Sequence, residues 1–275
     1  MMRVGQRADA APPHKRRHAY VEHSFDMVFF DIDDTLYDQA KPFAYAVHKV
    51  YGDVPGATDT ELFSASRAHS AQVFAAFSRG ELPTDYIYTR RMVDTLADFG
   101  VSISDELALK IQRAYERDTG KALSLSRPMQ QCLERCSSTC RVGVITNGAK
   151  GRQMGKLRLL HAWKWIEPDA VFISDELGMA KPDPAIFRYA CKSTGTRPER
   201  CLYIGDSYDN DVVGAVSAGM PVVWLNRRKK TRPADGAQPT GEVASDTELL
   251  DLLERILQPI AHCRAPQAGA VWNPA

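Results

Sequence analysis

Four acidic residues are crowded into the segment FFDIDDTLYD, which begins as an apolar run. Asp31, Asp33, Asp34 and Asp38 lie within eight residues. Because carboxylates at this density repel one another, we expect their role to be chemical rather than stabilising. Asp31 and Asp33 are two residues apart, so in an extended chain their side chains point to the same side. One can then attack a phosphorus atom while the other protonates the leaving oxygen, as phosphoryl transfer requires.

Two further acidic residues, Asp206 and Asp211, follow the apolar run CLYIG. Each contact between like charges near 4 Å costs about 4 kcal/mol at an effective dielectric constant near 20. If Asp31, Asp33, Asp206 and Asp211 gather around a phosphate, the summed cost of their repulsion therefore exceeds the free energy of unfolding of a typical domain, about 5–15 kcal/mol. A divalent cation is needed, and a set of oxygen ligands favours Mg²⁺ over zinc. Asp209 is an alternative to Asp211, because GDSYDND offers acids at two spacings.

Residues suited to hold a phosphoryl group follow a second apolar run, RVGVI. Thr146, Asn147 and Gly148 come directly after it, and Lys181 lies in KPDPAIF, just before an expected helix start. Thr146 can donate its hydroxyl to a phosphoryl oxygen, and Gly148 leaves room for close approach of the backbone. A lysine acts here as a fixed positive charge. Thr146, Asn147, Gly148 and Lys181 are thus the predicted substrate-binding set.

The elements that must position these residues are predicted from hydrophobic patterns. Short apolar runs typical of strands buried on both faces occur at 27–33, 141–147, 170–174, 201–206 and 221–226. Helical patterns separate the later runs, at 150–160, 184–194 and 209–218. This alternation predicts an α/β fold with a doubly wound, Rossmann-like parallel sheet. Polar residues at the carboxyl ends of such strands converge on one crevice.

The interval from 41 to 124 differs, because it carries helical patterns and no convincing strand. The patterns cover 41–51, 60–78, 84–99 and 104–118. We predict a small all-helical domain at 41–124, inserted into a core formed by 25–40 and 125–260. We expect a disordered basic leader at 1–24 and a flexible tail at 261–275. A Pro- and Gly-rich loop at 227–241 precedes a final helix at 247–257. Its RRKK start, 227–230, is interpreted as solvated, with contact to anionic substrates as the alternative.

Composition limits the classes of partner. Thirty-five basic and 34 acidic residues give a net charge of +1, which provides no global field for nucleic acid or an anionic membrane. No apolar run approaches the roughly 20 residues that span a bilayer, and the N-terminal segment lacks a secretory pattern, so a cytoplasmic location is predicted. Cys132, Cys136 and Cys140 lack the CxxC pairs of a zinc site. We interpret them as structural thiols, with a metal cluster as the alternative.

Taken together, four motifs resemble those of the haloacid dehalogenase superfamily of phosphohydrolases. They are the DxDxT segment at 31–35, Thr146 after its apolar run, Lys181 in KPDPAIF, and GDS at 205–207 followed by Asp211. They occur in the order expected for the family, over about 27–226. As a set they are highly specific, although any single motif would be weak.

The resemblance implies a role for each motif residue. Asp31 would be the nucleophile that forms an aspartyl-phosphate, Asp33 the acid and base, and Thr146 and Lys181 the stabilisers of the phosphoryl group. Mg²⁺ would be held by the side chains of Asp31 and Asp206 and the main-chain carbonyl of Asp33, with Asp211 supporting.

The resemblance also implies a phosphomonoesterase whose helical insertion caps the site. The expected substrate is a small phosphoester, either a nucleoside monophosphate or a sugar phosphate. A phosphomutase and a non-catalytic module that binds phosphate or a partner are the alternatives; dehalogenation is disfavoured, because those members lack an acid at the position of Asp33. Arg90 and Arg91 in the insertion are interpreted as solvated, with recognition of a second substrate charge as the alternative. The oligomeric state is left open.

Overall fold

Strand β1 (Met27–Phe30) lies inside a six-stranded parallel sheet of strand order β3-β2-β1-β4-β5-β6. The computed structural model describes residues 25–78 and 83–257. The other strands are β2 (Arg141–Thr146), β3 (Val171–Ile173), β4 (Cys201–Gly205), β5 (Val222–Leu225) and β6 (Gly241–Val243). The order reverses between β1 and β4, so the sheet is doubly wound and the predicted fold class is confirmed.

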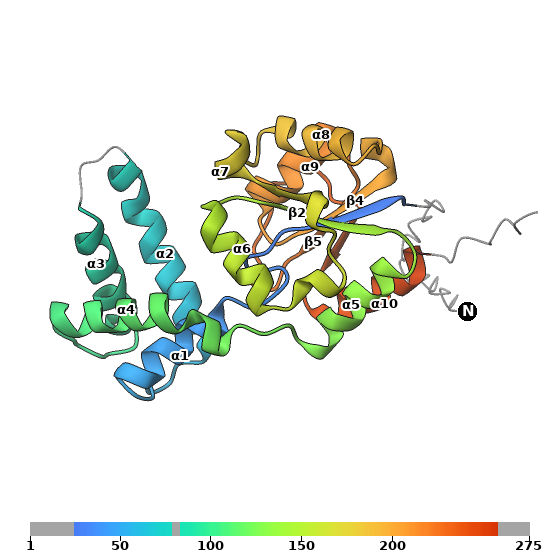
Figure 1. Ribbon diagram of the computed structural model, residues 1–275. Coiled ribbons are helices and arrows are strands. Elements are labelled where there is room, and N and C mark those ends of the chain that lie inside the picture. Colours follow the sequence, from blue (N-terminus) through green and yellow to red (C-terminus); the bar gives the residue numbers. More distant parts are fainter. Residues whose placement is uncertain (1–24, 79–82, 258–275) are drawn as a thin grey trace, which may run out of the picture.

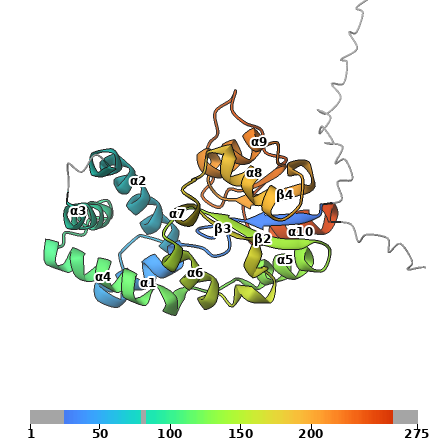
Figure 2. The same ribbon diagram turned by 45° about the horizontal axis from the view of Figure 1, so that its top comes forward.

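Side chains of β1 alternate between two hydrophobic cores, one on each face of the sheet. Met27 and Phe29 pack with helices α8 (Pro184–Ser193) and α9 (Val213–Ala218). Val28 and Phe30 face the opposite core, to which three other helices contribute: α5 (Arg127–Ser137), α6 (Lys150–Leu159) and α10 (Asp246–Ile256). Figure 2 shows α8 and α9 on one side of the sheet and α5, α6 and α10 on the other. Burial on both faces explains the unbroken apolar run of this strand.

The first four helices that the structure describes after β1 form a unit beside the sheet (Figure 1). They are α1 (Ala40–Val50), α2 (Asp59–Ser78), α3 (Thr84–Ala97) and α4 (Asp105–Ala122). Each of the four helical patterns found in the sequence between 41 and 124 corresponds to one of them. The unit has a hydrophobic core of its own, which includes Phe43, Leu62, Met92, Leu96 and Ile111. Helix α4 begins where the Ser104 hydroxyl accepts a hydrogen bond from the Leu107 N–H at 3.3 Å.

The structure differs from the predicted elements at several places. Helix α5 and strand β6 were not predicted, and β1 ends at Phe30, before the acidic residues rather than within them. A left-handed residue, Asp34 (φ 58°), follows soon after and turns the chain. In α5, Cys132 and Cys136 are buried in the core beside the sheet, which agrees with their interpretation as structural thiols.

Short helical segments complete the described part of the chain. They are α7 (Ser174–Leu177), a π-type turn (Tyr208–Val212), and single 3₁₀ turns at Ala162–Lys164, Pro168–Ala170 and Pro198–Arg200. None of the helices within 25–78 and 83–257 combines the length and the hydropathy required to cross a bilayer. The predicted leader at 1–24 and the predicted tail at 261–275 lie outside the described residues.

Gly143 in β2 provides a test of this packing. A Cβ atom there would lie 2.5 Å from the Ala170 carbonyl oxygen and 2.8 Å from the Phe29 ring. Overpacking of this kind costs about 1–3 kcal/mol, so we expect Gly143→Ala to lower the melting temperature by several degrees. Gly155→Ala is the matched control, because its Cβ would meet open space in helix α6; it is expected to be neutral or to stabilise by up to about 1 kcal/mol. Thermal unfolding that ranks the two variants in the reverse order would contradict the description of the sheet.

Candidate active site

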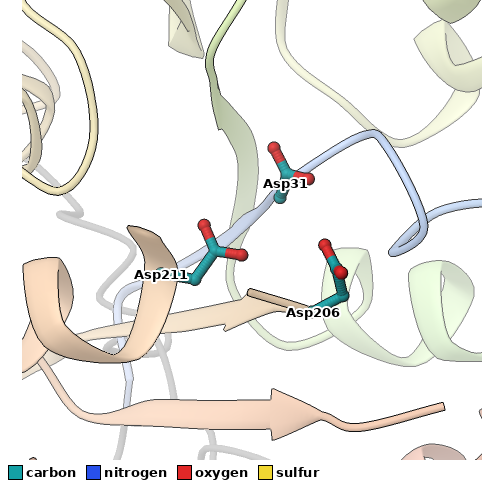
Figure 3. Close-up of side chains that lie close together, drawn as sticks. All are labelled: Asp31, Asp206 and Asp211. Atoms are coloured by element: carbon teal, nitrogen blue, oxygen red, sulfur yellow. The ribbon is translucent and has the colours of Figure 1, made fainter. Parts of the chain in front are cut away.

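Asp31, Asp206 and Asp211 come together beside the point where the strand order reverses (Figure 3). One oxygen atom from each carboxylate lies within 4.8 Å of the other two. Asp31 directly follows β1, Asp206 follows β4, and Asp211 lies in the π-type turn. Asp209, the alternative to Asp211 in the sequence, is exposed and lies outside this group.

The backbone around Asp211 fixes its carboxylate in this position. The Ser207 N–H donates to Asp211 Oδ2 at 2.8 Å. A Cβ atom at Gly205 would lie 2.4 Å from Asp211 Cγ, so only glycine leaves room for this carboxylate. The Trp224 indole donates to the Asp206 carbonyl at 2.8 Å and holds the neighbouring segment. The GDS motif is thus required for the shape of the site as well as for its charge.

Lys181 is buried between two of these carboxylates. Its Nζ lies 2.8 Å from Asp31 Oδ1 and 2.6 Å from Asp211 Oδ1, and it donates to the Tyr203 hydroxyl at 2.9 Å. Asn147 fixes the backbone at Lys181, because its side-chain amide accepts from the Lys181 N–H and donates to the Lys181 carbonyl, both at 2.9 Å. Asn147, predicted to bind substrate, therefore also positions the buried lysine.

Burial and mutual repulsion act on the protonation of the cluster. Burial raises the pKa of Asp31 to about 6, the charges of Asp211 and Asp33 act in the same direction, and Lys181 opposes them. Burial also raises the pKa of Asp206 well above its usual range, and Asp211 and Asp31 add to the effect. The cationic group beside Asp206 is the exposed Lys230, at 3.6 Å. Three carboxylates with so little compensating charge suit a bound divalent cation with oxygen ligands.

Asp33 has a different environment, although it is only two residues from Asp31. Lys156 Nζ lies 2.6 Å from both carboxylate oxygens, the Tyr37 hydroxyl donates at 2.5 Å, and Gln153 Nε2 donates at 3.1 Å. Burial alone would raise the pKa of Asp33, but Lys156 and these hydrogen bonds together lower it. Asp33 lies in the turn after β1, so the turn rather than the pleat of the strand aims its side chain.

Lys156, Gln153 and Tyr37 were missed in the sequence analysis. A signal was present, because Gln153 and Lys156 are three residues apart and therefore share one face of α6. Helix α6 begins at Lys150, four residues after Thr146. Gln153 also donates to the Thr146 hydroxyl oxygen at 3.0 Å and so connects two motifs.

One cavity of about 590 Å³ is lined by nearly all the predicted site residues: Asp31, Asp33, Thr146, Asn147, Lys181, Asp206 and Asp211. Gly148 is not among the described residues that line it. Its backbone has a φ of 131°, a conformation that favours glycine, and its N–H donates to the Ser174 hydroxyl at 3.0 Å. Gly148 therefore shapes the loop after β2.

The interpretation of RRKK as a solvated segment was wrong for its two arginines. Arg227 donates to the backbone carbonyls of Asp34 and Thr35. Arg228 lies 2.7 Å from Asp34 Oδ1 and also pairs with Asp38, and only about a tenth of its side chain is exposed. The four aspartates of the opening segment explain this result, because two of them need buried positive charge. Arg228 and Lys230 also line the cavity. Contact of this segment with anionic substrates, the alternative interpretation, stays a prediction.

Arg90 and Arg91 do not line the cavity. Arg90 pairs with Asp94 at 2.5 Å on the surface of α3. Arg91 is half-buried, donates to Gln112 and lies over the Tyr88 ring, so its interpretation as a solvated residue was wrong. The helical unit instead lines the cavity through α2, with Phe63, Ser64, Arg67 and Ala68.

Comparison with known proteins places this chain in a family. The sequence profile of haloacid dehalogenase-like hydrolases matches residues 25–219. The chain belongs to this family. Members similar to it include the pyrimidine 5′-nucleotidase YjjG of Escherichia coli, 26% identical over 83% of this chain and 98% of that protein. The glyceraldehyde 3-phosphate phosphatase of Methanothermobacter thermautotrophicus is 27% identical over 84% of this chain and 98% of that protein.

The fold of this haloacid dehalogenase-like hydrolase is also found among solved structures. The putative hydrolase YfnB of Bacillus subtilis superimposes with a TM-score of 0.63 at 24% identity, over 83% of this chain and 98% of that one. This similarity supports the fold alone.

Arg228 allows the charge balance of the opening segment to be tested. Arg228→Met leaves the buried Asp34 carboxylate without its guanidinium partner, which typically costs about 3–5 kcal/mol. We expect a clear drop in the midpoint of denaturant unfolding. Arg232→Met, an exposed arginine of the same loop, is the control and should change stability by less than about 0.5 kcal/mol. Adding Asp34→Asn to Arg228→Met should recover part of the loss; equal stability of the two arginine variants would refute the assignment.

Proposed function

We propose that this chain is a Mg²⁺-dependent phosphomonoesterase that hydrolyses a small phosphorylated metabolite through an aspartyl-phosphate on Asp31. The observation that carries the proposal is the group of Asp31, Asp206 and Asp211, with the buried Lys181 between Asp31 and Asp211, at the end of a cavity that accommodates a small molecule. The names of the similar family members, a nucleotidase and a sugar-phosphate phosphatase, support the same reaction class.

The proposed reaction divides the work between two aspartates. A carboxylate oxygen of Asp31 attacks phosphorus, the bond to the leaving oxygen breaks, and that oxygen takes a proton from Asp33. In the second step water attacks the phosphorus of the aspartyl-phosphate and gives a proton to Asp33, which releases inorganic phosphate and restores Asp31. Lys156 favours the ionised form of Asp33, which suits the second step. For the first step, Asp33 must bind a proton against that contact.

The remaining motif residues would stabilise charge on the phosphoryl group. Lys181 supplies a buried positive charge, and the Thr146 hydroxyl can donate to a phosphoryl oxygen. Asp31 and Asp206, with the main-chain carbonyl of Asp33 and support from Asp211, would hold Mg²⁺. The ion would supply the positive charge that offsets the carboxylates and the phosphoryl oxygens. In this proposal the helical unit at 41–124 is a cap over a core of 25–40 and 125–260.

The nucleophile is tested by Asp31→Asn, which removes the attacking carboxylate. We expect phosphate release from a panel of phosphorylated metabolites with Mg²⁺ to fall by at least about three orders of magnitude, with the melting temperature preserved. Asp209→Asn, an exposed aspartate in the GDSYDND segment, is the control and should keep wild-type activity. Release of inorganic phosphate by the wild type also separates a phosphatase from a phosphomutase. Near-normal turnover by Asp31→Asn would rule out the covalent route.

The raised pKa of Asp31 predicts how Mg²⁺ affinity depends on pH. Below about pH 6 a proton occupies this carboxyl group in the metal-free protein, so the ion must displace it. Affinity should therefore increase as the pH rises through about 6, because the competing proton is lost. Titration calorimetry between about pH 5 and pH 7.5, in two buffers of different ionisation enthalpy, should show proton release at the acid end. A constant affinity over this range would contradict the prediction.

A further inference from the structure

The cavity at the carboxylate cluster extends from the sheet edge to helix α2. Phe63, Ser64, Arg67 and Ala68 line it on that side, with the spacing of residues on one helix face. Figures 1 and 2 both show α2 as the part of α2–α4 nearest the sheet. At about 590 Å³ the cavity has the size of an ordinary small-molecule site, so it has room for a leaving group beyond the phosphoryl position.

Arg67 carries the positive charge of this far side. It is exposed, and it takes part in no ion pair or hydrogen bond with any residue of the described ranges. The other cations that line the cavity already face carboxylates: Lys181 contacts Asp31 and Asp211, Arg228 contacts Asp34, and Lys230 lies 3.6 Å from Asp206. The positive charge of Arg67 is therefore not balanced by a carboxylate of the described residues, and it lies on the α2 side of the cavity, away from the phosphoryl site.

The far side offers little to a nucleobase. Phe63 is the one aromatic residue among the described lining residues, and only 5% of its surface is exposed. The Arg228 guanidinium lies over its ring at 5.2 Å, and the Phe43 ring packs against it edge-on at 5.9 Å. An aromatic base stacks on an open ring face, which Phe63 does not provide. The uncharged polar groups that line the cavity, which include Gln39, Ser64 and Asn210, suit a polar leaving group without an aromatic ring.

We propose that the substrate is a phosphomonoester whose leaving group carries a second anionic group, and that Arg67 binds it. The inference rests on the proposed phosphatase function and names the substrate class within it. The second group is a carboxylate or another phosphate, since a guanidinium binds both by paired hydrogen bonds. Arg67 thus determines specificity and takes no part in bond breaking.

The test compares matched substrates in the wild type and in Arg67→Met. One pair is 3-phosphoglycerate and glycerol 3-phosphate, which differ by a carboxylate; the other is fructose 1,6-bisphosphate and fructose 6-phosphate, which differ by a phosphate. We expect kcat/KM of Arg67→Met to fall about 10- to 100-fold for the member with the second anionic group in at least one pair, with the member that lacks this group changing less than about threefold. The pair that shows the loss identifies the anionic group.

Two further variants separate a specific contact from a general effect of charge. Arg113→Met removes an exposed arginine of the same helical unit, on α4 and outside the cavity lining. It should leave kcat/KM unchanged for both members of each pair. Arg67→Lys keeps the charge and should retain part of the preference. Equal losses in Arg67→Met for substrates with and without the second anionic group, or no wild-type preference within either pair, would overturn the inference while leaving the phosphatase proposal in place. Failure to release phosphate from any substrate, including p-nitrophenyl phosphate, would instead overturn the phosphatase proposal on which it rests.

Discussion

Three carboxylates that share one buried edge of the sheet repel one another, and the surrounding residues are arranged to contain that repulsion. Lys181 is held between two of them by its own backbone contacts to Asn147, so its position does not depend on substrate. Gly205 has no side chain, and this leaves room for the Asp211 carboxylate. Such an arrangement costs stability in the free protein, and it persists where binding or catalysis needs concentrated charge.

Two neighbouring aspartates acquire opposite properties from their surroundings. Burial near like charges raises the pKa of Asp31, whereas Lys156, Tyr37 and Gln153 lower that of Asp33. In the proposed mechanism, a difference of this kind would separate the metal-binding nucleophile, Asp31, from the acid and base, Asp33. Lys156 and Gln153 belong to α6, which follows β2 and lies more than a hundred residues from Asp33 in the chain. The contrast between the two aspartates therefore exists only in the folded protein.

The sequence predicted the features that depend on local pattern. Apolar runs located five of the six strands, and the motif spacing identified the carboxylates and the lysine that the structure brings together. Helix α5 was missed even though Ser126 caps its start and its buried residues recur at helical spacing, because Cys132 and Cys136 were considered only as thiols. Strand β6 has three residues and follows a loop rich in proline and glycine, so it carries too little pattern. Arg228 and Lys156 were not identified, because their partners lie more than a hundred residues away in the chain. Long-range ion pairs leave no periodic signal.

The separate hydrophobic core of the α1–α4 unit bears on how such enzymes diversify. Leu62 and Phe63 anchor α2 in that core, while Ser64, Arg67 and Ala68 present their side chains on its exposed side. Substitutions at these three positions leave the packing of the sheet untouched, so selectivity is able to drift while the chemical machinery stays fixed. For directed evolution, a library confined to this helix face would sample new leaving groups without sacrificing foldability.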